Sequence, residues 1–186
     1  IYMEINEKRV GHQIRNFEKA LNGYSYDEPL ARYLARFFKE NKQMGSSDRK
    51  MTSRFIYNYF RLGHALKDQN LLDKLCYAEF LCESDSPLVS LNFPELTVEI
   101  SNLLIQKIQL LESKVSFDSN QIFPLLENLS ESIDKQSFLH SHFVQPDLFI
   151  RIKRGQEDFV KSALDQHDIA YTAFSTNTLT LPNGFR

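Results

Sequence analysis

The amino-acid sequence predicts an α+β protein, with an all-helical region first and a small β-α-β-β unit after it. Apolar residues recur at helical spacing through the first two thirds of the chain, and after Asp147 the pattern changes to short apolar or alternating runs. Of the 186 residues, 42% are hydrophobic, which is enough for a core. We expect the helical region to cover residues 1–146 and the α/β unit to cover residues 147–186.

The first two helices are indicated by apolar spacing and by a proline. The stretch "EKRVGHQIRNFEKALNGY" repeats apolar residues at three- and four-residue steps: Val10, Ile14, Phe17 and Leu21. Pro29 suits the first turn of a second helix that runs to about Asn41, because its fixed φ is helical and it has no N–H to leave unpaired.

A third helix is expected to begin at Ser46 or Ser47, either of which can cap it, and to run to about Leu66. Asp48 is favourable at the positive end of its dipole. A fourth helix should cover roughly residues 71–82, and "ESDSPLVSLNFPEL" after it reads as a loop with two prolines.

The rest of the helical region should contain a long helix over residues 100–115, whose broad apolar surface suggests a central, buried position. Shorter helices are expected over residues 122–129 and 135–143. In the α/β unit, "LFIRI", "IAYTAF" and "TLTL" are strand candidates, and a helix fits "GQEDFVKSALDQHD" between the first two.

The net charge of −2 conceals an uneven distribution along the chain. Residues 32–67 carry nine basic side chains against two acidic ones, whereas residues 68–147 carry four basic against thirteen acidic. At 100° per residue, the second and third helices each place their cations on the side opposite their apolar residues. Neither helix offers acidic partners at positions that would neutralise these rows.

For one helix, a charged face is ordinarily a solvated face. Two neighbouring helices with faces of the same sign favour an anionic ligand, because like charges at helical spacing repel. A row of Arg and Lys beside a tyrosine suits nucleic acid, since the cations pair with phosphates and the ring can stack on a base. The expected RNA-binding residues are Arg32, Arg36, Lys39, Lys42, Arg49, Lys50, Arg54, Tyr57 and Arg61.

The stretch "GSSDRKMTSRFIYNYFRLGHAL" resembles the signature helix of the NusB-like fold, which opens with an acidic-basic pair, here Asp48 and Arg49. More specifically, the chain is similar to the N-terminal, NusB-like RNA-binding region of the RsmB/Sun (Fmu) class of S-adenosylmethionine-dependent rRNA cytosine-5 methyltransferases. In that class "QP" and a strand with an arginine follow the helical domain, here "QPDLFIRIKRG". Lys153 stands where relatives commonly have asparagine.

The resemblance implies a fragment that docks ribosomal RNA and is itself non-catalytic. The chain opens on Ile1 and stops at "LPNGFR", which suggests a piece of a longer protein. In the class, the S-adenosylmethionine loop and the two catalytic cysteines would follow Arg186, so the cofactor is expected only in the full-length protein. The alternative is a NusB-like protein-interaction module related to transcription antitermination factors, whose basic faces meet an acidic partner.

Other chemistry is not indicated by the sequence. Cys76 and Cys82 are interpreted as small core residues, because two thiols without clustered histidines make neither a disulfide framework nor a zinc site. His140 and His142 fall on different sides of a helix, so no metal is expected. Without a long apolar run or an export signal, the expected location is the cytoplasm, with no membrane partner.

Overall fold

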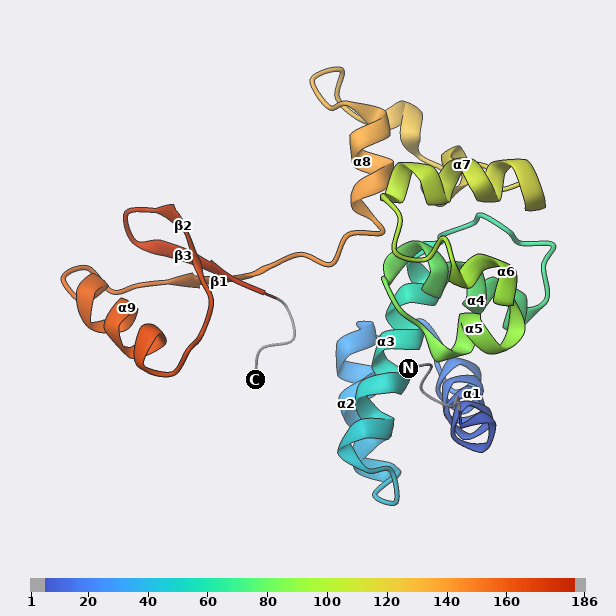
Figure 1. The fold of residues 1–186 in the computed structure, drawn as a ribbon, viewed down its shortest axis with the longest axis horizontal. Helices are drawn as coiled ribbons and strands as arrows, with labels where there is room; N and C mark the ends of the chain where they lie inside the picture. Colours follow the sequence, from blue (N-terminus) through green and yellow to red (C-terminus); the bar gives the residue numbers. More distant parts are fainter. Residues whose placement is uncertain (1–5, 183–186) are drawn as a thin grey trace. The chain divides into compact units, whose positions relative to one another are not determined.

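The computed structural model describes residues 6–182 and confirms a mixed α+β protein (Figure 1). The chain divides into two compact units, one ending at Phe143 and the next beginning at Val144. The sequence places the change at Asp147, a few residues later. The outer ends of both expected regions, residues 1–5 and 183–186, lie outside the described part.

The first four expected helices are present: α1 (Glu7–Asn22), α2 (Leu30–Glu40), α3 (Ser46–Arg61) and α4 (Leu71–Cys82). Asn6 and Asn70 cap α1 and α4 by accepting from the N–H groups of Arg9 and Asp73. The expectation that α3 runs to Leu66 is wrong. Gly63 and Leu66 adopt positive φ angles, 53° and 56°, which a right-handed helix cannot contain.

The segment expected to be a loop instead forms two short helices, α5 (Pro87–Asn92) and α6 (Pro94–Thr97). Each begins with its proline at the first helical position, where the missing N–H costs nothing. Leu88, Val89 and Leu96 from these helices are buried, so the segment contributes to the core.

The long buried helix expected over residues 100–115 is shorter and more exposed. Helix α7 (Leu104–Val115) buries Ile108 and Leu111, while Ile105 lies in solvent. The helix expected over residues 122–129 is replaced by two 3₁₀ turns, η1 (Ser119–Ile122) and η2 (Leu126–Asn128), on either side of Pro124. Helix α8 (Lys135–Ser141) is close to its expected span.

The helical unit contains two hydrophobic clusters. One joins α1, α2, α3 and α4 around Phe17, Phe37 and Phe55. The other joins α4, α7 and α8 around Leu81, Leu111 and Leu139. Helix α4 contributes to both clusters, which explains why buried residues occur all around it rather than on one side.

The second unit has the expected strand, helix, strand, strand order: β1 (Leu148–Arg151), α9 (Glu157–Gln166), β2 (Thr172–Ser175) and β3 (Thr178–Leu181). The strands form one antiparallel sheet in the order β1-β3-β2 (Figure 1). Val160 and Leu164 of α9 pack on Ile152, Leu179 and Leu181, so this unit has a small core of its own.

Between residues 6 and 182, no helix combines the length and the apolar character needed to cross a bilayer.

Candidate nucleic-acid interface

The connection between α2 and α3 is held in place by buried side chains. Asn41 donates from Nδ2 to the carbonyl oxygen of Phe37 at 2.8 Å, and its Oδ1 accepts from Lys19 Nζ at 2.6 Å. Met44 is buried, and its N–H donates to the carbonyl oxygen of Asn41 at 3.0 Å. The chain between the two cationic helices is therefore fixed to the end of α2 and to α1.

Helix α3 packs against α1 on one side and against α4 on another. Its buried residues accordingly include Thr52 and Asn58 besides Phe55 and Ile56. Sequence periodicity indicated a single apolar side opposite the cations. The structure corrects that picture, because part of the cationic side faces α4 rather than solvent.

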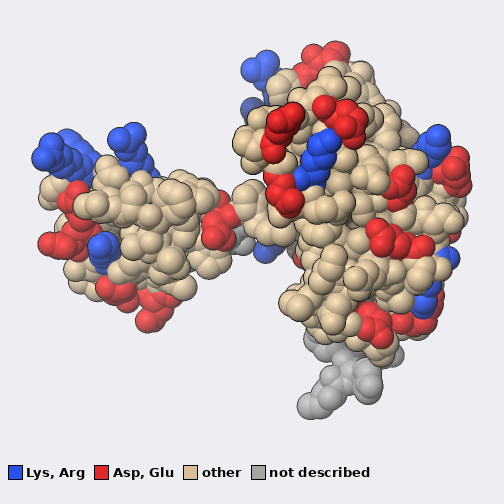
Figure 2. All heavy atoms as spheres, turned by 90° about the horizontal axis from the view of Figure 1, so that it is seen from above, with Lys and Arg blue, Asp and Glu red and all other residues tan. Residues whose placement is uncertain are grey.

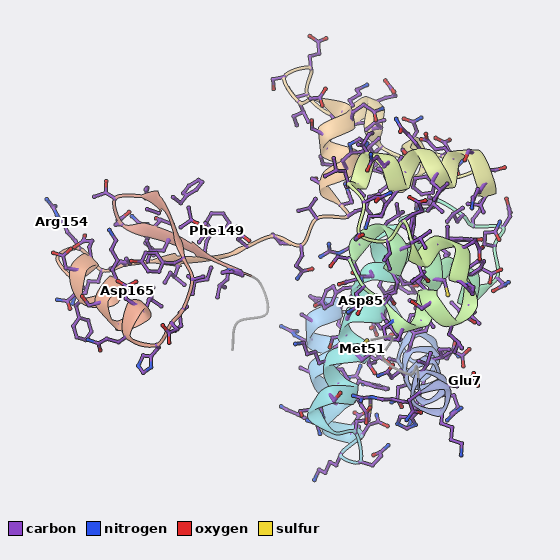
Figure 3. The ribbon with its side chains drawn as sticks, in the orientation of Figure 1. Glu7, Met51, Asp85, Phe149, Arg154 and Asp165 are labelled. Atoms are coloured by element: carbon purple, nitrogen blue, oxygen red, sulfur yellow. The ribbon has the colours of Figure 1, made fainter. Side chains whose placement is uncertain are left out.

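Arg54 shows the consequence most clearly. Its Nη2 donates to Glu79 Oε2 at 2.6 Å, and its Nε lies 3.3 Å from Glu83 Oε1. The same Nη2 donates to the carbonyl oxygen of Asp85 at 3.0 Å; Asp85 is labelled in Figure 3. The expectation that the cations of α3 have no acidic partners is therefore wrong at this position, since the partners come from α4 and the residue that follows it.

Glu79 is the centre of this network, and its side chain is completely buried. Asn58 Nδ2 donates to Glu79 Oε1 at 2.7 Å, and Ser86 Oγ donates to Glu79 Oε2 at 2.9 Å. Burial raises the pKa of the Glu79 carboxyl, and the nearby Arg54 guanidinium opposes that shift. Donors from α3 and from the segment before α5 thus converge on one carboxylate, which fixes α3 against α4.

Arg36 on α2 also has acidic partners within the chain. Its Nη2 pairs with Glu28 Oε1, and its Nη1 lies 3.7 Å from Glu40 Oε1. The guanidinium also lies over the ring of Tyr33, at 5.5 Å from the centroid. The two carboxylates compensate the charge of Arg36, and the hydrogen bond with Glu28 raises the pKa of its guanidinium.

Two further expected RNA ligands are bonded to backbone oxygens. Arg49 Nε donates to the carbonyl oxygen of Met44 at 2.8 Å, at the start of α3. Arg61 Nη1 reaches the carbonyl oxygen of His142 at 3.3 Å. The contact of Arg49 does not cancel its positive charge, so this residue can still attract an anion.

The remaining expected cations lie in solvent. We call them the α2–α3 surface: Arg32, Lys39, Lys42 and Lys50. None of the four forms an ion pair within residues 6–182. Tyr57 on α3 is 41% exposed, so its ring is available for stacking.

Two cations that the sequence analysis missed lie beside this surface. Arg9 Nη2 donates to Ser47 Oγ at 2.8 Å, and Lys19 Nζ binds Asn41 as described above. Both come from α1, and no spacing rule within α2 or α3 could have identified them. The apolar face of α1 is the sequence signal that could have identified Arg9 and Lys19. When that face packs on α3, these two cations lie near the α2–α3 connection.

The thiols are poor candidates for chemistry. Cys76 is buried and Cys82 is partly buried, and burial raises the pKa of each thiol to about 12. A nucleophilic cysteine requires the thiolate, which is scarce at neutral pH when the pKa is so high. Within the described part of the chain, no three His, Cys, Asp or Glu side chains are grouped as metal ligands.

Comparison with known proteins returned no match: no family model, no curated protein and no solved structure resembles the chain closely enough to place it.

Proposed function

We propose that the helical unit binds ribosomal RNA and that the α2–α3 surface contacts its phosphates. One observation carries this proposal: four exposed cations on adjacent elements have no carboxylate partner in the described chain. Unpaired surface cations of one sign repel each other, and a phosphate backbone relieves that repulsion while releasing condensed counterions. Arg9, Lys19 and Arg49 add charge around the same α2–α3 connection.

The ion-paired arginines Arg54 and Arg36 are not among the cations on which this proposal rests. Arg54 holds α3 against α4, and Arg36 is shared with Glu28 and Glu40. An arginine has five N–H donors, so either residue can also reach a phosphate, and their RNA contacts stay predictions. The RNA contacts of Tyr57 and Arg61 also stay predictions.

The wider identity is part of the same proposal. A NusB-like arrangement of the helices is supported by the resemblance of residues 45–66 and by the helical-then-α/β order of the chain. On this basis the chain is the N-terminal part of an S-adenosylmethionine-dependent rRNA cytosine-5 methyltransferase. Burial raises the pKa of Cys76 and Cys82 to about 12, so neither thiol is suited to supply the thiolate that this reaction requires.

The decisive experiment is fluorescence-anisotropy binding of a labelled ribosomal RNA hairpin at several salt concentrations. The triple variant Lys39→Glu/Lys42→Glu/Lys50→Glu should bind more weakly. Its slope of log affinity against log salt should be shallower by about 0.7–0.9 for each phosphate that the variant no longer neutralises. Because all three side chains are exposed, the variant should unfold at the wild-type urea concentration.

The control is Lys114→Glu, which reverses the charge of an exposed lysine without an ion pair in the described chain, on α7 and away from this surface. Equal RNA affinity of the triple variant and this control would reject the proposal. Arg54→Glu is unsuitable as a test, because it would place a second carboxylate against the buried Glu79 and disturb the fold.

The second candidate function is a NusB-like protein-interaction module of the antitermination type. Exposed apolar side chains at the α6–α7 connection favour it, since Val98 and Leu103 are 76% and 71% exposed. The two candidates differ in salt dependence. An RNA-binding module shows steep, salt-sensitive affinity for the hairpin, whereas a purely protein-binding module shows none.

A further inference from the structure

The sheet of the second unit has one covered face and one open face. Alternation along β1 sends Ile150 and Ile152 toward α9, so Phe149 and Arg151 point to the opposite face. Thr180 of the central strand β3 is paired with Phe149 on one side and with Thr172 on the other. Within the described part of this unit, no helix covers the face that these residues share.

Two aromatic rings lie next to each other on the open face. Phe149 of β1 and Phe174 of β2 are 55% and 69% exposed, and their rings meet edge to face with centroids 5.3 Å apart. Phe174 falls at the irregularity of the β2–β3 pairing, between Ala173 and Ser175. A bulge of this kind changes the direction of a side chain from that of the regular alternation. Two adjoining, exposed aromatic rings on a three-stranded sheet indicate a ligand-binding surface.

Basic side chains follow the rings along the chain, and α9 on the other face carries Lys161 besides its acidic residues. Arg151, Lys153 and Arg154 follow Phe149 along the chain, on and just after β1. The acidic side chains of α9, Glu157, Asp158 and Asp165, belong to the helix on the other face. In Figure 2 the basic side chains of this unit gather mainly along one edge, and the acidic ones gather mainly along the opposite edge. Figure 3 shows Phe149 on the sheet, apart from Asp165 on α9.

We propose that this open face binds single-stranded RNA, with bases stacked on Phe149 and Phe174 and phosphates bound by Arg151 and Lys153. An anionic strand matches the positive charge beside the rings, and unpaired bases offer the flat apolar faces that aromatic side chains accept. A purely apolar partner would leave the cations unpaired. The site belongs to the second unit alone and does not depend on the α2–α3 surface.

Hydroxyl groups beside the rings favour RNA over DNA as the bound strand. Thr172 lies on the outer strand β2, and Thr178 lies on the central strand β3, where it pairs with Arg151. The Thr178 hydroxyl makes a long contact of 3.4 Å, to Asn177 Oδ1. Such hydroxyls can exchange hydrogen bonds with a ribose 2′-OH, which DNA lacks.

The test measures binding of labelled oligouridylate to the full chain. Phe149→Ala/Phe174→Ala should weaken binding at least about fivefold, as expected when one base loses its stacking partner. Phe149→Leu/Phe174→Leu keeps apolar volume but removes the π faces, and it should weaken binding similarly. Phe149→Tyr/Phe174→Tyr should retain wild-type affinity.

The matched control is Phe159→Ala, which removes an equally exposed ring, 72% exposed, from α9. The control should leave affinity unchanged, and circular dichroism should show all variants folded. A decrease of affinity in the control equal to that in the double variants would overturn the proposal, as would unchanged affinity in the Leu and Ala variants. Tighter binding of oligodeoxythymidylate than of oligouridylate would overturn the choice of RNA.

A second copy of the chain is the competing occupant, and sedimentation velocity separates the two. If the wild type sediments as a dimer that Phe149→Ala/Phe174→Ala dissociates, the face is a self-association surface and the proposal fails. Failure of this proposal can be told apart from failure of the α2–α3 proposal. The lysine variants are tested for binding to the structured hairpin, and the phenylalanine variants are tested for binding to the single strand.

Discussion

Arg54 and Glu79 are 25 residues apart in the sequence and form a two-pronged ion pair between α3 and α4, with Nη2 2.6 Å from Oε2 and Nε 3.2 Å from Oε1. The carboxylate is fully buried, whereas the arginine side chain keeps 27% of its surface exposed. The pair therefore joins the centre of the helical unit to its surface. Its partners also explain why α3 presents less free charge than its sequence indicates.

Removing the carboxylate alone should destabilise the helical unit. Glu79→Ala leaves Arg54 without its main partner and Ser86 without an acceptor, and Asn58 keeps only its bond to Glu83 Oε1. The expected cost is about 3–5 kcal/mol in the free energy of unfolding. Urea unfolding followed by circular dichroism measures this. The double variant Arg54→Met/Glu79→Leu should regain much of the stability, because it removes both charges together. If Glu79→Ala is as stable as the wild type, the pair does not have the stabilising role assigned to it.

Lys107 should be equally hard to replace. Its side chain is buried, and its Nζ donates to the carbonyl oxygens of Phe80, Glu83 and Ile100 at 2.8–3.0 Å. Lys107→Met fits the space but leaves these oxygens without a donor, which costs about 1–3 kcal/mol for each one that stays buried. The exposed Lys114, on the same helix, provides the comparison. Equal midpoints of urea unfolding for Lys107→Met and Lys114→Met would argue against this bonding.

Gly63 occupies a position that no other residue suits. Its φ is +53°, and an added Cβ would lie 1.8 Å from the carbonyl oxygen of Ile122. Backbone strain alone costs about 1–3 kcal/mol at such a position. Gly63→Ala should destabilise the protein further, because the added Cβ also clashes with the carbonyl oxygen of Ile122. Gly11→Ala should instead stabilise by about 0.5–1 kcal/mol, because Gly11 is inside α1 and a Cβ there meets only the end of Arg15. Thermal unfolding should therefore move in opposite directions for the two variants.

Stability should fall as the solution becomes strongly alkaline. The pKa of Cys76 is raised by burial from 9.0 to about 12, so between these pH values the folded chain keeps a proton that the unfolded chain has released. Unfolding then becomes easier with rising pH, by at most about 1.4 kcal/mol per pH unit for one thiol. Cys76→Ala should show a shallower decline than the wild type over this range. Parallel declines would mean that other groups dominate.

Local sequence was sufficient wherever a helix or strand depends on neighbours within a few residues. The span of α4, the span of β3 and the strand, helix, strand, strand order of the second unit were all predicted, because hydrophobic periodicity and turn residues act locally. The same reasoning failed for α5 and α6. Their short spans carry too little periodicity to outweigh the two prolines, and burial of Leu88, Val89 and Leu96 decides them.

The candidate site divides in the same way. Sequence alone determined that cations are concentrated in α2 and α3, because charge and helical spacing are properties of the chain itself. Only the tertiary structure decided which of them stay unpaired. Arg54 is neutralised by a carboxylate from another helix, whereas Lys42 and Lys50 are not, and Arg9 joins the surface from α1. Ion pairing depends on distances of a few ångströms between side chains, and packing sets those distances for residues far apart in the sequence.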